Sequence, residues 1–308
     1  MTMLDLQIAD AVERLQSGTL IGLPTETVYG LAGDATSAEA VARIYALKGR
    51  PSFNPLIAHI ASMEMAEREA EFSDTARKLA DAFWPGALTM VLPVSKTNSI
   101  CDLARAGLDT QALRFPAHPI AQKVISAFGK PLAAPSANKS GQISPTLKRH
   151  VEEEFGSALP LILDGGQSVL GIESTVLAVF GDEVTLLRPG SLGRKQIEDV
   201  VGHAIASSMH DDNAPRSPGM LSRHYAPQAR LRLNVAEPSA DEAYLGFGKS
   251  DHETALNLSE SANLTEAASN LYAMLRELDA HHDAIAVAPI PETGLGEAIN
   301  DRLRRAAL

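Results

Sequence analysis

The sequence predicts an α/β protein made of two units. Short apolar runs typical of strands alternate with stretches of helical periodicity through the first two hundred residues. This alternation stops after Gly202 in a polar, proline-bearing stretch at 210–219, and it resumes beyond Pro227. A chain of 308 residues is long enough to bury a core in each unit.

The first unit begins with a helix predicted over 5–17, where apolar residues recur at helical spacing until Gly18. An apolar strand at 19–23 follows and stops at Pro24. Further helices are predicted over 38–47, 74–83, 118–128 and 145–155, and further strands over 55–60, 88–94, 112–115, 132–134, 161–163, 175–179 and 184–187.

The second unit repeats this alternation on a smaller scale. Strands are predicted at 229–235, 243–247 and 284–288, with one helix marked by the apolar face from Leu264 to Leu278 and a final one from Leu295 to Leu303. We therefore divide the chain into a first domain at 1–202, a linker at 203–228 and a small α/β domain at 229–308.

Composition and charge narrow the function classes. Apolar residues make up 45% and charged residues 21%, as in a soluble globular protein. A net charge of −11 argues against nucleic-acid binding as the main function, since a phosphate backbone is bound by a basic face. The segment 101–150 nevertheless holds seven Lys/Arg against two Asp/Glu, a local field suited to a small anion. The first 17 residues form neither a signal peptide nor a membrane span, and the single Cys101 excludes a disulfide framework.

Two polar segments are candidates for anion binding. Lys48 and Arg50 supply a pair of cations, while Ser136 and Asn138 supply a hydroxyl and an amide. Taken alone, the two cations are more typical of charges at a helix C-terminus. The common phosphate-binding glycine loops are absent from the sequence, so a nucleotide would bind here without them.

Six motifs in one order change this assessment. They are Thr25-Glu26-Thr27-Val28-Tyr29-Gly30, Lys48-Gly49-Arg50-Pro51, Asn54-Pro55-Leu56-Ile57 with His59, Trp84-Pro85-Gly86 with Leu88-Thr89, Leu108-Asp109-Thr110 with Arg114 and Pro116, and Ala134-Pro135-Ser136-Ala137-Asn138. With the segment from Ser217 to Pro227, this pattern resembles the long, two-domain form of the YrdC-like threonylcarbamoyl-AMP synthase family. The resemblance is dense from about 5 to 230 and weaker beyond.

The resemblance implies a fold and a reaction. The fold is a YrdC-like twisted sheet whose flanking helices form a concave pocket, followed by a small Rossmann-like domain. The reaction joins L-threonine, bicarbonate or CO2 and ATP into threonylcarbamoyl-adenylate and pyrophosphate, for the threonylcarbamoyladenosine modification of tRNA. Negative charge gathers on both partners, so positioning and electrostatic stabilisation should dominate catalysis.

The family pattern also assigns residues. Lys48 and Arg50 are implied as catalytic cations, and Arg114 as the bidentate clamp for the amino-acid carboxylate. Implied ATP contacts are Arg50, Asn54, Thr110, Ser136, Asn138, Ser144, Arg188 and Tyr225. Implied threonine contacts are Thr27, His59, Arg114, Ala134 and Ser174. Mg²⁺ is expected with ATP, but its ligands stay unassigned, and Glu26 and Glu173 are equally compatible with a structural and a metal-binding role.

Three further expectations accompany the synthase reading. The linker, with Tyr225, is expected to close over the nucleotide, so that ATP plus threonine protects 213–228 from proteolysis. The protein is expected in the cytoplasm, away from membranes, and delivering its product to the tRNA threonylcarbamoyl transferase machinery, with weak direct tRNA contact left open. The alternatives are a non-catalytic RNA-binding YrdC-like module and a carbamoyl-handling domain of the hydrogenase-maturation type.

Overall fold

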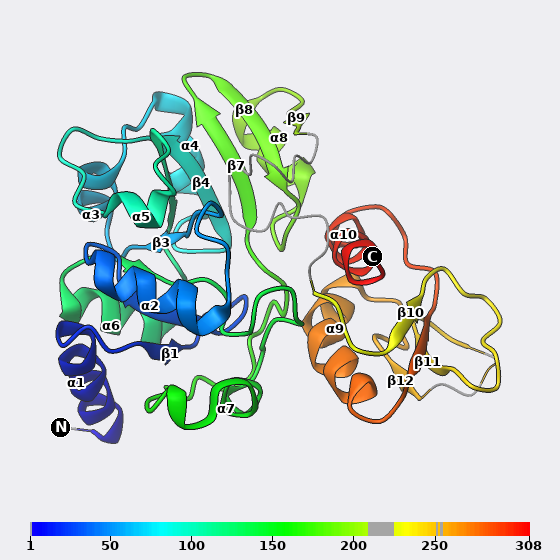
Figure 1. The fold of residues 1–308 in the computed structure, drawn as a ribbon. Coiled ribbons are helices and arrows are strands. Elements are labelled where there is room, and N and C mark those ends of the chain that lie inside the picture. The colour runs from blue at the N-terminus through cyan, green and yellow to red at the C-terminus, as the bar shows by residue number, and fades with distance from the viewer. Residues whose placement is uncertain (1, 209–224, 251, 253–254) are drawn as a thin grey trace.

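A nine-stranded mixed sheet frames the first domain in the computed structural model (Figure 1). The structure describes residues 2–208, 225–250, 252 and 255–308. The strand order is β1-β2-β6-β3-β5-β4-β7-β8-β9. The strands are β1 (Ile21–Leu23), β2 (Gly30–Asp34), β3 (Ala58–His59), β4 (Leu88–Pro93), β5 (Thr110–Arg114), β6 (Leu132–Ala133), β7 (Thr175–Phe180), β8 (Glu183–Arg188) and β9 (Ala206–Ser207).

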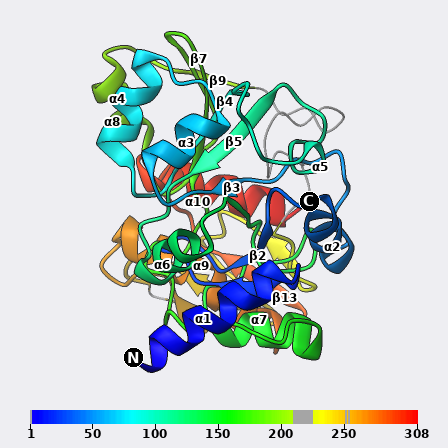
Figure 2. The same cartoon turned by 90° about the vertical axis from the view of Figure 1, so that its left-hand side faces the viewer.

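Helices flank this sheet and pack their apolar faces into its core. They are α1 (Met3–Gln16), α2 (Ala38–Lys48), α3 (Met63–Glu69), α4 (Asp74–Phe83), α5 (Asp102–Arg105), α6 (Pro119–Phe128), α7 (Lys148–Phe155) with the 3₁₀ turn η1 (Gly156–Ala158), and α8 (Arg194–Val201). Figure 2 shows α1 and α6 side by side on one flank. Local chemistry sets the limits of α2, because the Ser37 side chain caps its N-terminus and Gly49 adopts φ 61° at its C-terminus.

The centre of the sheet brings distant motifs together. His59 of β3 pairs with Arg114 of β5 in parallel and with Leu132 of β6 antiparallel. Ala137 N–H donates to the Tyr29 carbonyl over 2.8 Å, which joins the Ser136 loop to the segment after β1. The motifs that lie far apart in the chain therefore meet at one edge of β3, β5 and β6.

The second domain is a four-stranded parallel sheet with two helices. Its strands are β10 (Arg230–Arg232), β11 (Ala243–Gly246), β12 (Leu256–Asn257) and β13 (Ala284–Val287), in the order β10-β13-β11-β12. The helices are α9 (Leu264–Asp279) and α10 (Leu295–Ala306). Figure 1 shows both helices on the side that faces the first domain.

The predicted α/β class and the long helices are confirmed, with differences at short elements. The predicted strand at 161–163 is wrong, because Ile162 makes only an isolated bridge to Gly22. The strand β2 was not predicted, since its Gly-Leu-Ala-Gly-Asp sequence lacks β-branched residues and becomes a strand only by pairing with β1 and β6. The short elements α3, α5, α8, β9 and β12 were also not predicted.

The predicted domain limits stay a prediction. β9 pairs with β8, so the first sheet continues to Ser207, beyond the predicted limit at 202. Most of the linker expected to act as a lid, 209–224, lies outside the described residues. None of the described helices is both long and apolar enough to cross a bilayer.

Candidate active site

A largely enclosed pocket lies where the central strands meet the loop around Ser136. Its cavity volume is about 50 Å³, room for a few water molecules. Nine of the fourteen predicted site residues line it: Thr27, Arg50, His59, Arg114, Ala134, Ser136, Ser174, Arg188 and Tyr225. The structure therefore brings these nine residues together from segments spread over the first domain and the end of the linker, and their roles stay a prediction.

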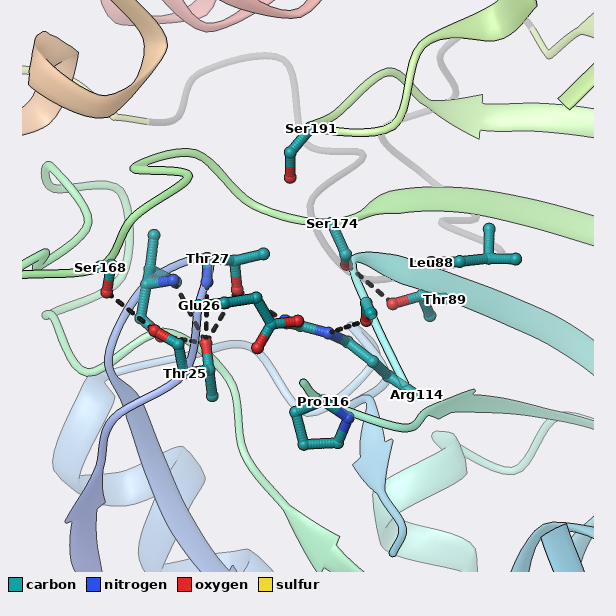
Figure 3. Close-up of polar contacts among 12 residues, drawn as sticks. Thr25, Glu26, Thr27, Leu88, Thr89, Arg114, Pro116, Ser168, Ser174 and Ser191 are labelled. Carbon is teal, nitrogen blue, oxygen red and sulfur yellow. Dashed lines mark hydrogen bonds and ion pairs between the residues drawn. The ribbon is translucent and has the colours of Figure 1, made fainter. Parts of the chain in front are cut away.

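Arg114 dominates one end of this pocket. Its Nη1 donates to Thr27 Oγ1 over 2.7 Å and its Nη2 to Glu26 Oε1 over 2.6 Å (Figure 3). Nε is 3.3 Å from the Gly86 carbonyl. Burial opposes the ionised form of Glu26, but Arg114 outweighs it and lowers the pKa of this carboxyl. A guanidinium has five N–H donors, so two remain for a ligand.

His59 lies beside Arg114 and is a neutral imidazole. Burial, followed by the charge of Arg114, lowers the pKa of His59 to about 3. Its Nδ1 is buried and has no hydrogen-bond partner among the described residues. This nitrogen can therefore exchange a hydrogen bond with a polar ligand group at neutral pH.

The third wall comes from the start of β7. Ser174 Oγ hydrogen-bonds Thr89 Oγ1 over 2.7 Å, as Figure 3 shows. The Ser174 carbonyl accepts from Arg188 Nη2 over 2.8 Å, which holds this guanidinium against the same wall. The parallel pairing of Leu88 with Thr175 places both hydroxyls at one end of the sheet.

Arg50 is the cation of the opposite end. Its Nη2 donates to Asn54 Oδ1 over 2.6 Å and to the Pro55 carbonyl over 2.9 Å. Burial lowers the pKa of Arg50 to about 10, so it stays charged at pH 7. Asn54 does not line the pocket but fixes the orientation of Arg50.

Lys48 lies in a different place from the one expected. The sequence suggested an anion-binding, catalytic cation, whereas the structure directs Nζ to the carbonyls of Ser136 (2.6 Å) and Asn138 (2.5 Å). Lys48 is 2% exposed and does not line the pocket. Burial and then the charge of Arg50 lower the pKa of this ammonium. In this geometry Lys48 holds the Ser136 loop in place, and a direct role in the reaction stays a prediction.

Three other predicted contacts also lie behind the pocket wall. Asn138 donates to the carbonyls of Lys139 and Gln142 and so braces its own loop. Ser144 donates to Glu173 over 2.6 Å. Thr110 begins β5, at the end of that strand away from Arg114, and is not part of the lining.

The pocket wall includes residues that sequence reasoning did not assign to it. Thr25 accepts hydrogen bonds from the backbone amides of Thr27 and Val28, forming the turn that presents Thr27. Glu173 also lines the pocket. Its position beside the predicted Ser174 was the available signal, but its partners lie in the second domain and could not be read from the sequence.

The carboxylates near the pocket do not fit a protein-held Mg²⁺. Glu26 is paired with Arg114, and Glu173 is paired with Arg302 over 2.8 Å, so each is already neutralised by an arginine. Over the described part of the chain, no group of three or more His, Cys, Asp or Glu side chains could hold a metal ion. Neither of these two carboxylates is therefore suited to hold Mg²⁺.

Family models match almost the whole chain. A Sua5/YciO/YrdC model described as "Telomere recombination" matches residues 13–190. A model described as "Threonylcarbamoyl-AMP synthase, C-terminal domain" matches residues 192–308.

Individual relatives agree with these models. The chain is 39% identical to a threonylcarbamoyl-AMP synthase of Bacillus subtilis, over 98% of this chain and 93% of the relative. A shorter threonylcarbamoyl-AMP synthase of Photobacterium profundum is 33% identical, over 59% of this chain and 98% of the relative. The crystal structure of Sua5 from P. abyssi complexed with L-threonine superposes with a TM-score of 0.90 at 39% identity, covering 97% of this chain and 94% of that one.

Proposed function

The chain belongs to the threonylcarbamoyl-AMP synthase family, and we propose that its pocket is where L-threonine, bicarbonate and ATP become threonylcarbamoyl-AMP and pyrophosphate. The observation that carries this assignment to particular atoms is the distribution of charge in the pocket. Arg114, Arg50 and Arg188 all line the pocket and are buried; Arg114 is bonded to Glu26 and Thr27, whereas Arg50 and Arg188 both interact with Tyr225. Two separate anion-binding ends suit a reaction that joins two anionic substrates.

Threonine binds at the Arg114 end in this proposal. The two remaining N–H groups of the Arg114 guanidinium bind the threonine carboxylate, while its hydrogen bonds to Glu26 and Thr27 fix its orientation. The neutral His59 and the Ser174 hydroxyl also line the pocket and bind the amine and the side-chain hydroxyl of threonine in this proposal. The likeness to a relative solved with L-threonine supports threonine as the amino acid that binds.

ATP binds at the other end, with its phosphates toward Arg50 and Arg188. Both guanidinium groups are preoriented by backbone and side-chain acceptors, so little reorganisation accompanies charge build-up on the phosphates. Ser136 contributes a hydroxyl, and Lys48 fixes the loop that carries it.

The chemistry follows from this placement in two steps. The threonine amine attacks bicarbonate or CO2 to give a carbamate, with loss of water or of a proton. A carbamate oxygen then attacks the α-phosphorus of ATP, and pyrophosphate leaves with the electron pair of the broken P–O bond. The protein supplies proximity and fixed positive charge, because both reacting groups are anionic.

The pocket is too small in this structure for both substrates. Since about 50 Å³ holds a few waters, part of the wall must move to admit a nucleotide. Tyr225, the first described residue after position 208, is part of that wall.

Several finer assignments belong to the same proposal. The enzyme is a nucleotidyltransferase that takes ATP with Mg²⁺ carried on its phosphates, and it delivers the adenylate to the tRNA threonylcarbamoyl transferase machinery in the cytoplasm. Delivery to a transferase is expected on chemical grounds, because a mixed anhydride with AMP is a reactive species that must be passed to its acceptor.

Pyrophosphate release tests the proposed function. Purified protein with ATP, Mg²⁺ and bicarbonate should release pyrophosphate only when L-threonine is added, and mass spectrometry should find threonylcarbamoyl-AMP. Threonine-independent release, or none, would contradict the proposal. Binding of RNA without any release would favour the non-catalytic RNA-binding alternative.

A further inference from the structure

The second domain places two side chains on a carboxylate of the pocket wall. Tyr272 of α9 donates its hydroxyl to Glu173 Oε2 over 2.8 Å, and Arg302 of α10 donates Nε to the same oxygen over 2.8 Å. Arg302 is 1% exposed. The other carboxylate oxygen of Glu173 accepts from Ser144 Oγ over 2.6 Å. One carboxylate thus joins Ser144 of the first domain to both helices of the second.

The same helices hold the aromatic ring of Tyr225. Its ring stacks on that of Tyr272, with centroids 5.6 Å apart and planes at 23°. The guanidinium groups of Arg302 and Arg305 lie 5.1 Å and 5.2 Å from the Tyr225 centroid, within cation–π range. Tyr225 is 1% exposed, has φ 66° and lines the pocket.

Electrostatics fixes the ionisation of this cluster. Burial opposes the charge of Glu173, but Arg302 and then Arg188 outweigh it and lower the pKa of Glu173 to about 2. The carboxylate is therefore ionised at neutral pH, and Arg302 is its directly bonded counter-ion. A buried pair of this kind holds both partners in one geometry, since either charge left alone would be strongly unfavourable.

Two residues make both contacts, Tyr272 and Arg302, and the charged one is Arg302. Arg302 donates to the Glu173 carboxylate, which also accepts a hydrogen bond from Ser144, and its guanidinium lies over the ring of Tyr225. Tyr225 lines the pocket, and Ser144 lies behind its wall, bonded to the lining residue Glu173. By contrast, over the part of the chain that the structure describes, Thr27, His59 and Arg114 make no hydrogen bond to α9 or α10 and are held by β3, β5 and the segment after β1.

We propose that Arg302 of the second domain is a positioning residue for the nucleotide end of the synthase pocket, acting through Tyr225 and through Glu173 with Ser144. This inference rests on the proposed function. It gives the second domain a role in the reaction that the short relative, which covers only 59% of this chain, must do without or fill differently.

The test separates the two substrates. Arg302→Met removes the charge and the fork but keeps an apolar stem, so the KM for ATP should rise by roughly tenfold or more. The KM for L-threonine should stay within about twofold, because its site is held by the first domain. Isothermal titration calorimetry with ATP alone should show the same loss of affinity without turnover.

Matched variants separate positioning from folding. Arg304→Met alters a neighbouring arginine of α10 whose partner is the exposed Glu292, and both KM values should match those of the unaltered protein. Arg302→Lys keeps a charge beside Glu173 but not the planar fork over Tyr225, so it should recover part of the ATP affinity. Tyr272→Phe keeps the ring stack and removes one hydrogen bond to Glu173, so its effect on the KM for ATP should be smaller than that of Arg302→Met.

The outcomes distinguish this inference from the proposed function. If the unaltered protein releases pyrophosphate with threonine but Arg302→Met leaves ATP affinity and KM unchanged, the positioning role is refuted and the function stands. Equal rises in both KM values, without rescue by Arg302→Lys, would also refute it, because they indicate general loss of structure. If the unaltered protein has no synthase activity, the proposed function fails first, and unchanged ATP binding in Arg302→Met would overturn the positioning role as well.

Discussion

Replacing Glu173 by glutamine removes the charge of the interdomain pair with little change of shape. The pKa of Glu173 is about 2 in the folded protein, against an ordinary value of 4.5 for a glutamate side chain. Each unit of this difference corresponds to about 1.4 kcal/mol, so the ionised carboxylate contributes on the order of 3 kcal/mol at pH 7. This agrees with the roughly 3–5 kcal/mol typical of breaking a buried ion pair. Glu173→Gln should therefore lower the free energy of unfolding by about 3 kcal/mol.

The pH dependence gives an independent check. The folded-state pKa of this carboxyl lies below its unfolded value, so its contribution is fully present above pH 4.5 and is lost as pH falls from there toward about 2. Over that window the stability of the unaltered protein should fall more steeply than that of Glu173→Gln.

Urea denaturation followed by circular dichroism and by Trp84 fluorescence measures both effects. Trp84 is the single tryptophan and lies in the first domain, so a difference between the two probes also reveals separate unfolding of the domains. Glu292→Gln, at an exposed ion pair with Arg304, is the matched control and should change stability by less than about 1 kcal/mol. If Glu173→Gln behaves like this control and shows the same pH slope as the unaltered protein, our account of the pair is refuted.

Three further predictions concern the pocket itself. Lys48→Met leaves the carbonyls of Ser136 and Asn138 without their ammonium partner, so kcat/KM for ATP should fall by roughly tenfold or more while the circular dichroism spectrum stays unchanged. The control is Lys78→Met at an exposed lysine, and equal activity of the two variants would rule out this loop-holding role. Arg114→Lys replaces a fork by a point charge and should raise the KM for threonine by about tenfold but that for ATP little, as steady-state kinetics would show, and a selective loss for ATP would reverse our assignment of the two ends. His59 has a pKa of about 3 in the folded protein, below its unfolded value, so its burial lowers the free energy of unfolding only as pH falls below about 6.5. The NMR shifts of its ring should stay constant from about pH 5 to 8, and titration within that range would contradict its proposed neutral state.

The site could be predicted from the sequence where a motif carries its own local geometry. The Ser37 cap and Gly49 end α2, so they fix the position of Lys48 and Arg50 at its C-terminus. Arg114 at the end of β5 and Ser174 directly before β7 both line the pocket. Short-range chemistry determines such positions, because caps, turns and strand alternation act within a few residues.

The sequence could not show which way a side chain turns once two segments pack. The sequence suggested Lys48 as an anion-binding cation, yet its ammonium donates to the carbonyls of Ser136 and Asn138, about ninety residues away in the chain. Strand β2 forms only because two neighbours pair with it, since its small residues carry no strand preference of their own. Hydrogen-bond competition between distant segments decides both cases.

By itself, the sequence determined the α/β class, the two-part layout and the family with its reaction, because these depend on periodicity and on motifs that are local in the chain. Only the tertiary structure decided that Glu26 occupies one side of Arg114 and that Glu173 is neutralised by Arg302 of the second domain. Those pairings join residues up to 129 positions apart. Burial forces each charge to find its partner in space, and the order of residues along the chain does not encode which partner that is.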